Sequence, residues 1–226
     1  MFSKLLRAIE VAAREGGPNV EGNMTLASAV QKARDYSVPV DNIDRAIKRG
    51  AGEAGGARYE EVTYEGYGPG GVAVLVSAMT DNRNRTGQDV RHAFSRLGGN
   101  LGDPGSVAWM FQRRGLVVLD RTAAREEDRL LEIALEAGAD DLRASGEQWE
   151  IITDPDTLPA VRAALEAANI PFLSAELTML PQSGVPVDSD RAHSVLRLIE
   201  ALEDLEDVQA VYSNFDIPEE ILAEAG

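Results

Sequence analysis

The sequence contains no cysteine and only two histidines among its 226 residues. A chain without cysteine can form neither disulfide bonds nor thiolate zinc sites, which excludes a disulfide-stabilised secreted scaffold. His92 and His193 fall on different predicted helices, and neither has a further ligand at the spacing that a metal site requires. We therefore expect both histidines to be structural or surface residues, and we expect no metal and no cofactor.

Long apolar runs are absent as well. No stretch approaches the roughly 18 consecutive apolar residues that a membrane-spanning helix needs, and residues 1–10 lack the apolar block and cleavage site of a signal peptide. Hydrophobic residues still make up 44% of the chain, which is enough to form real cores in a few compact domains. We expect a cytoplasmic protein without a membrane partner.

Positive charge is scarce overall, with 22 Lys and Arg against 38 Asp and Glu and a net charge of −16. That balance by itself disfavours nucleic acid as a partner, because phosphate contacts require Lys or Arg. The two halves differ, however: residues 1–115 carry 15 basic and 13 acidic side chains, whereas residues 116–226 carry 7 and 25. The first half can therefore bind phosphates, and the acidic half is either a solvated surface or a site for a basic protein.

The apolar spacing of residues 1–57 predicts three short helices that pack as a small bundle. Asn23 is a suitable cap for the second helix. The third begins with Asp41 as its N-cap and carries Lys48 and Arg49 in its last turn, where cations suit the helix dipole.

Residues 58–115 switch to the two-residue period of strands before a further helix. The predicted elements are strands at 61–65, 72–76 and 107–111, a polar loop at 81–85 and a helix over 86–97. The glycine-rich run at 66–71 stands between two strands and is not followed by Gly-Lys-Ser/Thr, which indicates a hairpin turn and not a phosphate-binding loop.

Residues 116–182 alternate in the strand and helix order of a ferredoxin-like unit, with the second helix opening at 154–155. Segment 188–213 adds a helix and a strand that the 58–115 unit lacks, so we expect it to return and complete that unit. The predicted fold class is α+β, with an N-terminal three-helix bundle and two ferredoxin-like α/β domains, the third inserted in the second. The predicted domains are a helical one at 1–57, a middle one at 58–115 and 183–226, and an inserted one at 116–182.

Residues 81–96 hold the densest group of candidate nucleic-acid-binding side chains. A helix with Val90 and Phe94 turned inward leaves its polar residues facing solvent beside the preceding loop. The candidate binding residues here are Arg83, Asn84, Arg85, Arg91, His92 and Arg96. Arginine matches phosphate oxygens and asparagine can reach base edges or sugar hydroxyls, although the same arginines could instead pair with Asp81 and Asp89.

A second basic group, near the end of the third helix, consists of Arg45, Lys48 and Arg49. These residues either contact nucleic acid or only complement the helix dipole. The glycine-rich loop at 98–106 is long enough to contact a partner. Because no nucleophile, base and oxyanion donors can be assigned to one place, we expect no enzymatic activity.

Long, ungapped motifs occupy residues 41–50, 64–71, 80–86, 90–95, 98–102, 105–111 and 203–215. Together they closely resemble the YebC family, to which the mitochondrial translational activator of cytochrome c oxidase belongs. The resemblance covers nearly the whole chain. It implies three domains with the third inserted in the second, no enzymatic activity, and a role in gene expression.

The family resemblance implies one of two roles: a DNA-binding transcriptional regulator, or a ribosome-associated translation factor that eases stalling at proline-rich stretches. It also implies a basic N-terminal segment rich in Lys, His and Trp, whereas this sequence starts at Met1 where that segment would be ending. Because such an arm adds electrostatic affinity, we expect weaker nucleic-acid binding than the family implies.

The residues and the resemblance together support three hypotheses. The leading one is a translation factor that binds ribosomal RNA or transfer RNA through the basic first half, with Arg83, Arg85, Arg91 and Arg96 on phosphates. The alternative is a regulator that binds promoter DNA, which the net charge and the lack of a helix-turn-helix pattern disfavour. The third is a protein-interaction module whose acidic half binds a basic protein.

Overall fold

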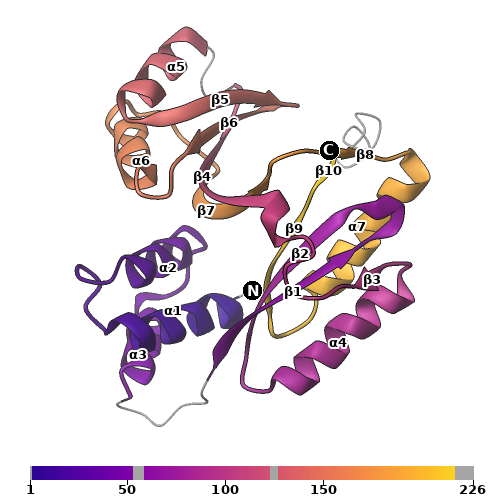
Figure 1. The fold of residues 1–226 in the computed structure, drawn as a ribbon. Helices are drawn as coiled ribbons and strands as arrows, with labels where there is room; N and C mark the ends of the chain where they lie inside the picture. The colour runs from indigo at the N-terminus through magenta and orange to yellow at the C-terminus, as the bar shows by residue number, and fades with distance from the viewer. Residues whose placement is uncertain (1, 53–58, 123–126, 217–226) are drawn as a thin grey trace. The chain divides into compact units, whose positions relative to one another are not determined.

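The computed structural model describes residues 2–52, 59–122 and 127–216, whose path Figure 1 shows. They form two compact units. The larger unit contains the described residues within Met1–Met110 and Ser183–Pro218, and the second unit is built on Phe111–Gln182. The predicted α+β class and the inserted ferredoxin-like domain are confirmed, while the finer three-domain boundaries stay a prediction. None of the helices in the described ranges is long and apolar enough to cross a membrane.

The predicted three-helix bundle is present in the larger unit. Its helices are α1 (Phe2–Gly16), α2 (Met24–Asp35) and α3 (Val40–Gly50). They share an apolar core that includes Ile9, Leu26 and Ile43. The predicted cap of α2 is confirmed, because the Asn23 side chain accepts a hydrogen bond from the Leu26 backbone N–H at 3.0 Å.

The predicted N-cap of the third helix is wrong. Asp41 lies inside the first turn of α3, and Pro39 occupies the capping position without a side-chain hydrogen bond. The Pro39 carbonyl oxygen accepts the first intrahelical bonds, from the backbone N–H groups of Asn42 at 2.9 Å and Ile43 at 3.2 Å. Asp41 still stabilises this end of the helix through its charge.

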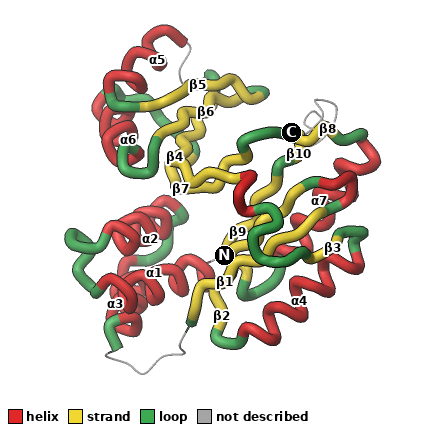
Figure 2. The backbone as a smooth tube through the Cα atoms, in the orientation of Figure 1, coloured by secondary structure: helices red, strands yellow, loops and turns green. Residues whose placement is uncertain are grey.

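The larger unit also contains an antiparallel four-stranded sheet in the order β3-β1-β2-β9. Its strands are β1 (Glu60–Tyr67), β2 (Ala73–Thr80), β3 (Asn100–Leu101) and β9 (Val208–Ser213). Helices α4 (Arg83–Arg96) and α7 (Ser189–Glu203) cover one face of this sheet, as the red helices against the yellow strands show in Figure 2. Because β9 pairs with β2, segment 188–213 does return to complete the sheet.

The core of the sheet lies between its strands and these two helices. Val74 and Val76 of β2 pack with Phe94 of α4 and Leu198 of α7, and all four side chains are fully buried. Since the apolar face of α4 is used in this way, its polar residues are held outside the core.

The predicted strand at 107–111 is wrong. Residues Ala108–Met110 form a short 3-10 helix, and Phe111 is the first residue of the long strand β4 (Phe111–Asp120). The backbone N–H groups of Val107 and Ala108 donate to the Glu65 carboxylate and are therefore not available to a neighbouring strand. Two short parallel strands, β8 (Val185–Pro186) and β10 (Phe215–Asp216), and the short helix η1 (Pro69–Gly71) complete the larger unit.

The second unit is a ferredoxin-like sheet in the antiparallel order β5-β6-β4-β7 with two helices. Besides β4, its elements are α5 (Glu127–Glu136), β5 (Ala139–Ser145), β6 (Gln148–Thr153), α6 (Leu158–Ala167) and β7 (Ser174–Pro181). The predicted start of the second helix at 154–155 is wrong. Residues 154–157 form a turn in which the Thr157 N–H donates to the Asp154 carbonyl oxygen at 3.1 Å, and α6 begins at Leu158.

Candidate nucleic-acid interface

The candidate site begins at the corner where β2 ends and α4 starts. The Asn82 side chain accepts a hydrogen bond from the Arg85 backbone N–H at 3.2 Å, so Asn82 is the N-cap of α4. The predicted polar loop at 81–85 is therefore wrong, because Arg83 and Asn84 lie in the first turn of the helix. Their side chains project from a rigid element, which favours a defined binding geometry.

A groove of about 580 Å³, called the α4 groove below, opens beside the outer face of α4. Its lining comes from β1, from α4 and from the loop that follows β3. The helix contributes Arg83, Asn84, Gly87, Gln88 and Arg91. The fold thus brings three of the predicted binding residues, Arg83, Asn84 and Arg91, into one concave surface beside part of the glycine-rich loop at 98–106.

The other three predicted residues of this region lie on a different face of the same helix. At about 100° per residue, Arg85, His92 and Arg96 fall within roughly 40° of one another and away from the groove stripe. All three are exposed, and none of them lines the groove. The six predicted residues therefore lie on two faces of α4: Arg83, Asn84 and Arg91 line the α4 groove, and Arg85, His92 and Arg96 do not.

Arg83 and Arg91 are both available to an anion. The Arg83 side chain is 61% exposed, and its Nε lies 3.6 Å from the carboxylate of Glu60, which is also exposed. Such surface pairs contribute about 0–1 kcal/mol, so a phosphate can replace Glu60. Arg91 is exposed, and within the described ranges no hydrogen bond or ion pair holds its guanidinium group.

One buried carboxylate holds the loop that forms the far wall of the groove. Glu65 accepts hydrogen bonds from the backbone N–H groups of Gly105 at 2.6 Å and of Val107 and Ala108 at 2.7 Å. Burial by itself raises the pKa of Glu65, but these three N–H groups outweigh it, so the pKa lies below its ordinary value of 4.5. At neutral pH the charged carboxylate fixes the loop against β1.

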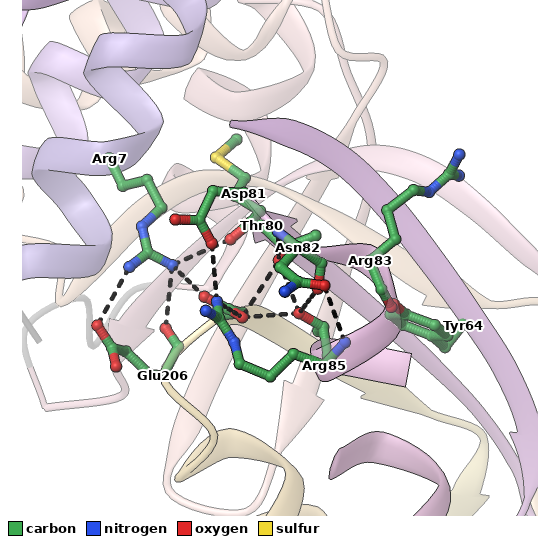
Figure 3. Close-up of polar contacts among 11 residues, drawn as sticks. Arg7, Tyr64, Thr80, Asp81, Asn82, Arg83, Arg85 and Glu206 are labelled. Carbon is green, nitrogen blue, oxygen red and sulfur yellow. Dashed lines mark hydrogen bonds and ion pairs between the residues drawn. The ribbon is translucent and has the colours of Figure 1, made fainter. Parts of the chain in front are cut away.

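Arg85 has a different environment from Arg83, as Figure 3 shows: Arg83 extends away while Arg85 turns toward two carboxylates. Arg85 Nη2 donates to Asp81 Oδ1 at 2.9 Å and to Asp207 Oδ2 at 2.6 Å. Asp207 is buried just before β9, and it also accepts a hydrogen bond from Thr86 Oγ1 at 2.7 Å. Arg85 thus joins α4 to the far edge of the sheet, and its role in phosphate binding stays a prediction.

Asp207 also connects the helical bundle to the sheet. Arg7 of α1 is buried, and its Nη1 donates to Asp207 Oδ1 at 2.9 Å and to the Met79 carbonyl oxygen at 3.0 Å. Burial by itself raises the pKa of Asp207. The hydrogen bonds from Arg85 and Thr86 and the charges of Arg85 and Arg7 outweigh burial, so the pKa lies below its ordinary value of 3.8. One carboxylate therefore ties α1, α4 and β9 together.

The basic residues of α3 make local contacts of their own. Arg49 Nε donates to the buried carboxylate of Glu10 on α1 at 2.6 Å, which helps to hold the two helices together. Arg45 Nε donates to the Asp41 carbonyl oxygen at 3.0 Å, and Lys48 is exposed. A nucleic-acid contact through Arg45, Lys48 and Arg49 stays a prediction.

The acidic half of the chain is not a structural unit. Residues 183–216 return to the larger unit and bring 2 arginines against 8 Asp and Glu. The acidic residues at 203–207 lie at the β9 edge of the sheet, whereas the α4 groove lies at the β1 and β3 edge. Although acidic side chains are numerous, no three His, Asp or Glu residues in the described ranges gather as a metal site requires. The lining of the α4 groove brings together two arginines, Arg83 and Arg91, and the carboxylates of Glu65 and Asp103.

Four residues of the site were not predicted from the sequence: Tyr64, Glu65, Gln88 and Asp207. A carboxylate at a buried position of β1, followed by a loop rich in backbone N–H groups, is the pattern that could have indicated the role of Glu65. Asp207 offers no local pattern, because its partner Arg7 stands 200 positions earlier in the chain.

Comparisons with known proteins show the family to which this chain is related. A family model described as the TACO1/YebC protein N-terminal domain matches residues 1–53, and one described as the TACO1/YebC second and third domain matches residues 59–215. A relative from Acidothermus cellulolyticus, named probable transcriptional regulatory protein, is 54% identical over 99% of this chain and 90% of its own length. A relative of the same name from Syntrophus aciditrophicus is 52% identical over 98% of this chain and 89% of its own length. The crystal structure of a conserved hypothetical protein from Aquifex aeolicus matches with a TM-score of 0.86 at 49% identity, over 98% of this chain and 91% of that one. This chain belongs to the TACO1/YebC family.

Proposed function

We propose that this protein is a non-enzymatic, cytoplasmic regulator of gene expression that binds the ribosome through RNA, with the α4 groove as its RNA contact. In this role it acts as a translation factor and relieves stalling at proline-rich sequences. The observation that carries the proposal is the exposure of Arg83 and Arg91 on one wall of a concave surface. Ribosomal RNA and transfer RNA are the phosphate-dense partners that such a surface suits.

The spacing of the two arginines fits the phosphodiester backbone of RNA. Arg91 stands eight positions after Arg83, which corresponds to about 12 Å along the helix axis. This spacing leaves room for the two guanidinium groups to contact different phosphates. Because α4 is capped by Asn82 and packed through Phe94, little backbone order has to be gained on binding.

Binding to promoter DNA is the second candidate function, and the names of the relatives favour it. A helix-turn-helix arrangement would place α3 in the major groove. The exposed face of α3 carries Asp41 and Asp44 beside Arg45 and Lys48, so its charges cancel. The net charge of −16 also repels a DNA duplex, which is why the RNA role is the leading proposal.

Sedimentation of tagged protein from a cell lysate on a sucrose gradient, with and without RNase, tests the proposal. We expect co-migration with ribosomes that RNase treatment abolishes. Protein that stays at the top of the gradient in both samples would contradict the ribosomal role. A promoter fragment that competes better than random DNA at matched salt would then support the DNA role.

A further inference from the structure

The polar lining of the α4 groove does not match phosphate alone. Besides its two arginines, the groove contains the side-chain amides of Asn84 and Gln88 and the exposed carboxylate of Asp103. A carboxylate repels phosphate, but it accepts hydrogen bonds from the amino groups of bases. Amide side chains both donate to and accept from base edges. The mixture of groups is therefore suited to a base with its flanking phosphates.

An aromatic ring is part of the same lining. Tyr64 is half-buried, and its hydroxyl group donates to the Arg83 carbonyl oxygen at 3.3 Å, which fixes the ring relative to α4. Gly87 stands opposite this ring, and a Cβ atom there would lie 3.6 Å from it. The absence of a side chain at Gly87 thus leaves the ring accessible from the groove. Stacking on an aromatic ring is worth about 1–3 kcal/mol per base and requires a base that is not already stacked in a duplex.

The size and shape of the groove favour an unpaired nucleotide over a duplex. Its volume of about 580 Å³ lies within the range of roughly 300–1,000 Å³ that is usual for small-ligand pockets. In an RNA duplex the Watson–Crick edges are paired, both faces of each base are stacked, and the deep, narrow major groove keeps side chains from the remaining base edges, so a paired base cannot use both the polar groups and the ring of a concave site. Sequence-dependent recognition of RNA generally uses loops and bulges with splayed-out bases for this reason.

We propose that the α4 groove binds an unpaired RNA nucleotide, with the base on the Tyr64 ring, its polar edge at Gln88 and Asp103, and the neighbouring phosphates on Arg83 and Arg91. This inference rests on the proposed function and deepens it, because it names single-stranded or bulged RNA as the ligand of the groove. Two negative charges, Asp103 in the lining and Glu60 beside Arg83, then act against the continuous phosphate ridge of a duplex.

Gly87→Leu tests the proposal without changing any charge. The contact of 3.6 Å is ordinary van der Waals distance, and Gly87 has no positive φ, so the backbone accepts a side chain. Helix propensity rises on replacing glycine, which keeps α4 folded. Ser95→Leu is the matched control, because it adds the same side chain to an exposed position of α4 that does not line the groove.

The assay is fluorescence anisotropy of the full chain with a labelled short single-stranded RNA, and with the same RNA annealed to its complement. Wild-type protein should bind the single strand more tightly than the duplex at equal salt. Gly87→Leu should weaken single-strand binding by about tenfold, a loss within the range for one stacked base, and Ser95→Leu should stay within about twofold of wild type. Equal binding by wild type and Gly87→Leu, a wild-type preference for the duplex, or no binding of either RNA overturns the proposal.

Ribosome sedimentation separates this inference from the function on which it rests. Suppose that Arg83→Ala with Arg91→Ala releases the protein from ribosomes, while Gly87→Leu leaves both sedimentation and single-strand affinity unchanged. The ribosomal role then stands and the nucleotide pocket is refuted. If wild type does not sediment with ribosomes but Gly87→Leu still loses single-strand affinity, the pocket stands and the ribosomal role is refuted.

Discussion

Replacing Asp207 with asparagine removes the buried charge on which α1, α4 and β9 converge. The side chain keeps its size, so the change isolates the charge. Arg7 then loses its buried carboxylate partner while it remains buried itself, with 9% of its side chain exposed, and it keeps only the exposed carboxylate of Glu206, 3.4 Å from its Nη2. Arg85 is half-exposed and keeps Asp81 as a partner, so its share of the loss is small.

The magnitude follows from the environment of Arg7. Breaking a buried ion pair from one side costs about 3–5 kcal/mol, because the remaining charge is left uncompensated. Arg7 retains the Met79 carbonyl oxygen and the exposed Glu206 carboxylate as acceptors, and the asparagine oxygen can still accept from Thr86, which places the loss at the lower end. We expect Asp207→Asn to lower the free energy of unfolding by roughly 3 kcal/mol and the Tm by about 6–12 °C.

Urea and thermal unfolding of the full chain measure this loss, and Asp81→Asn provides the matched control. Asp81 binds the same arginine, Arg85, but is exposed, so its replacement should cost less than about 1 kcal/mol. A double-mutant cycle of Asp207→Asn with Arg7→Met should give a coupling above about 1 kcal/mol. Equal and small losses for Asp207→Asn and Asp81→Asn would refute the assignment of Asp207 as the connection between bundle and sheet.

Three further predictions concern the same unit. Glu65→Gln takes the charged acceptor away from the backbone N–H groups of Gly105, Val107 and Ala108, so amide hydrogen exchange in the loop at 102–108 should accelerate. An unchanged exchange rate would contradict the role of Glu65. Gly50→Ala places a Cβ 2.8 Å from Ala13 Cβ and against the Glu10 carbonyl oxygen, so unfolding experiments should show a loss of about 1–3 kcal/mol that a Gly22→Ala control does not share. The pKa values of Asp207 and Glu65 are lowered in the folded protein, so both charged carboxylates stabilise the fold when the pH is above their ordinary pKa values of 3.8 and 4.5. This contribution is lost as the pH falls through the lower pKa values of the folded protein. The Tm should therefore drop on acidification below about pH 4, and less so in Asp207→Asn; an equal drop in both proteins would count against the argument.

The fold was predictable where its cause is local. Apolar periodicity gives α1, α2 and α7 directly, and the lack of a second helix in 58–115 indicates that 188–213 must return. The errors occur where a single side chain or a tertiary contact decides. Asn82 acts as a cap and so converts an apparent loop into the first turn of α4, and Glu65 takes the N–H groups that a strand at 107–111 would have needed.

The site was predictable only in its composition. The run of basic and amide residues around α4 identifies the region, but helix geometry decides that Arg83 and Arg91 share the groove while His92 and Arg96 do not. Arg85 carries the same charge as Arg83, but it lies on a different face of α4 and pairs with Asp81 and with the distant Asp207. Chain order alone does not indicate which edge of the sheet the acidic residues at 203–207 join, and the pairing of β9 with β2 decides it.

Sedimentation of the double variant Arg83→Ala with Arg91→Ala, compared with wild type, tests the account most directly. Arg129→Ala with Arg143→Ala is the control, because it removes the same charge from exposed positions of the second unit. We expect the groove variant to leave the ribosomal fractions while it keeps the wild-type Tm, and the control to co-migrate with ribosomes as wild type does. Undiminished ribosome association of the groove variant would contradict the claim that the α4 groove is the RNA contact.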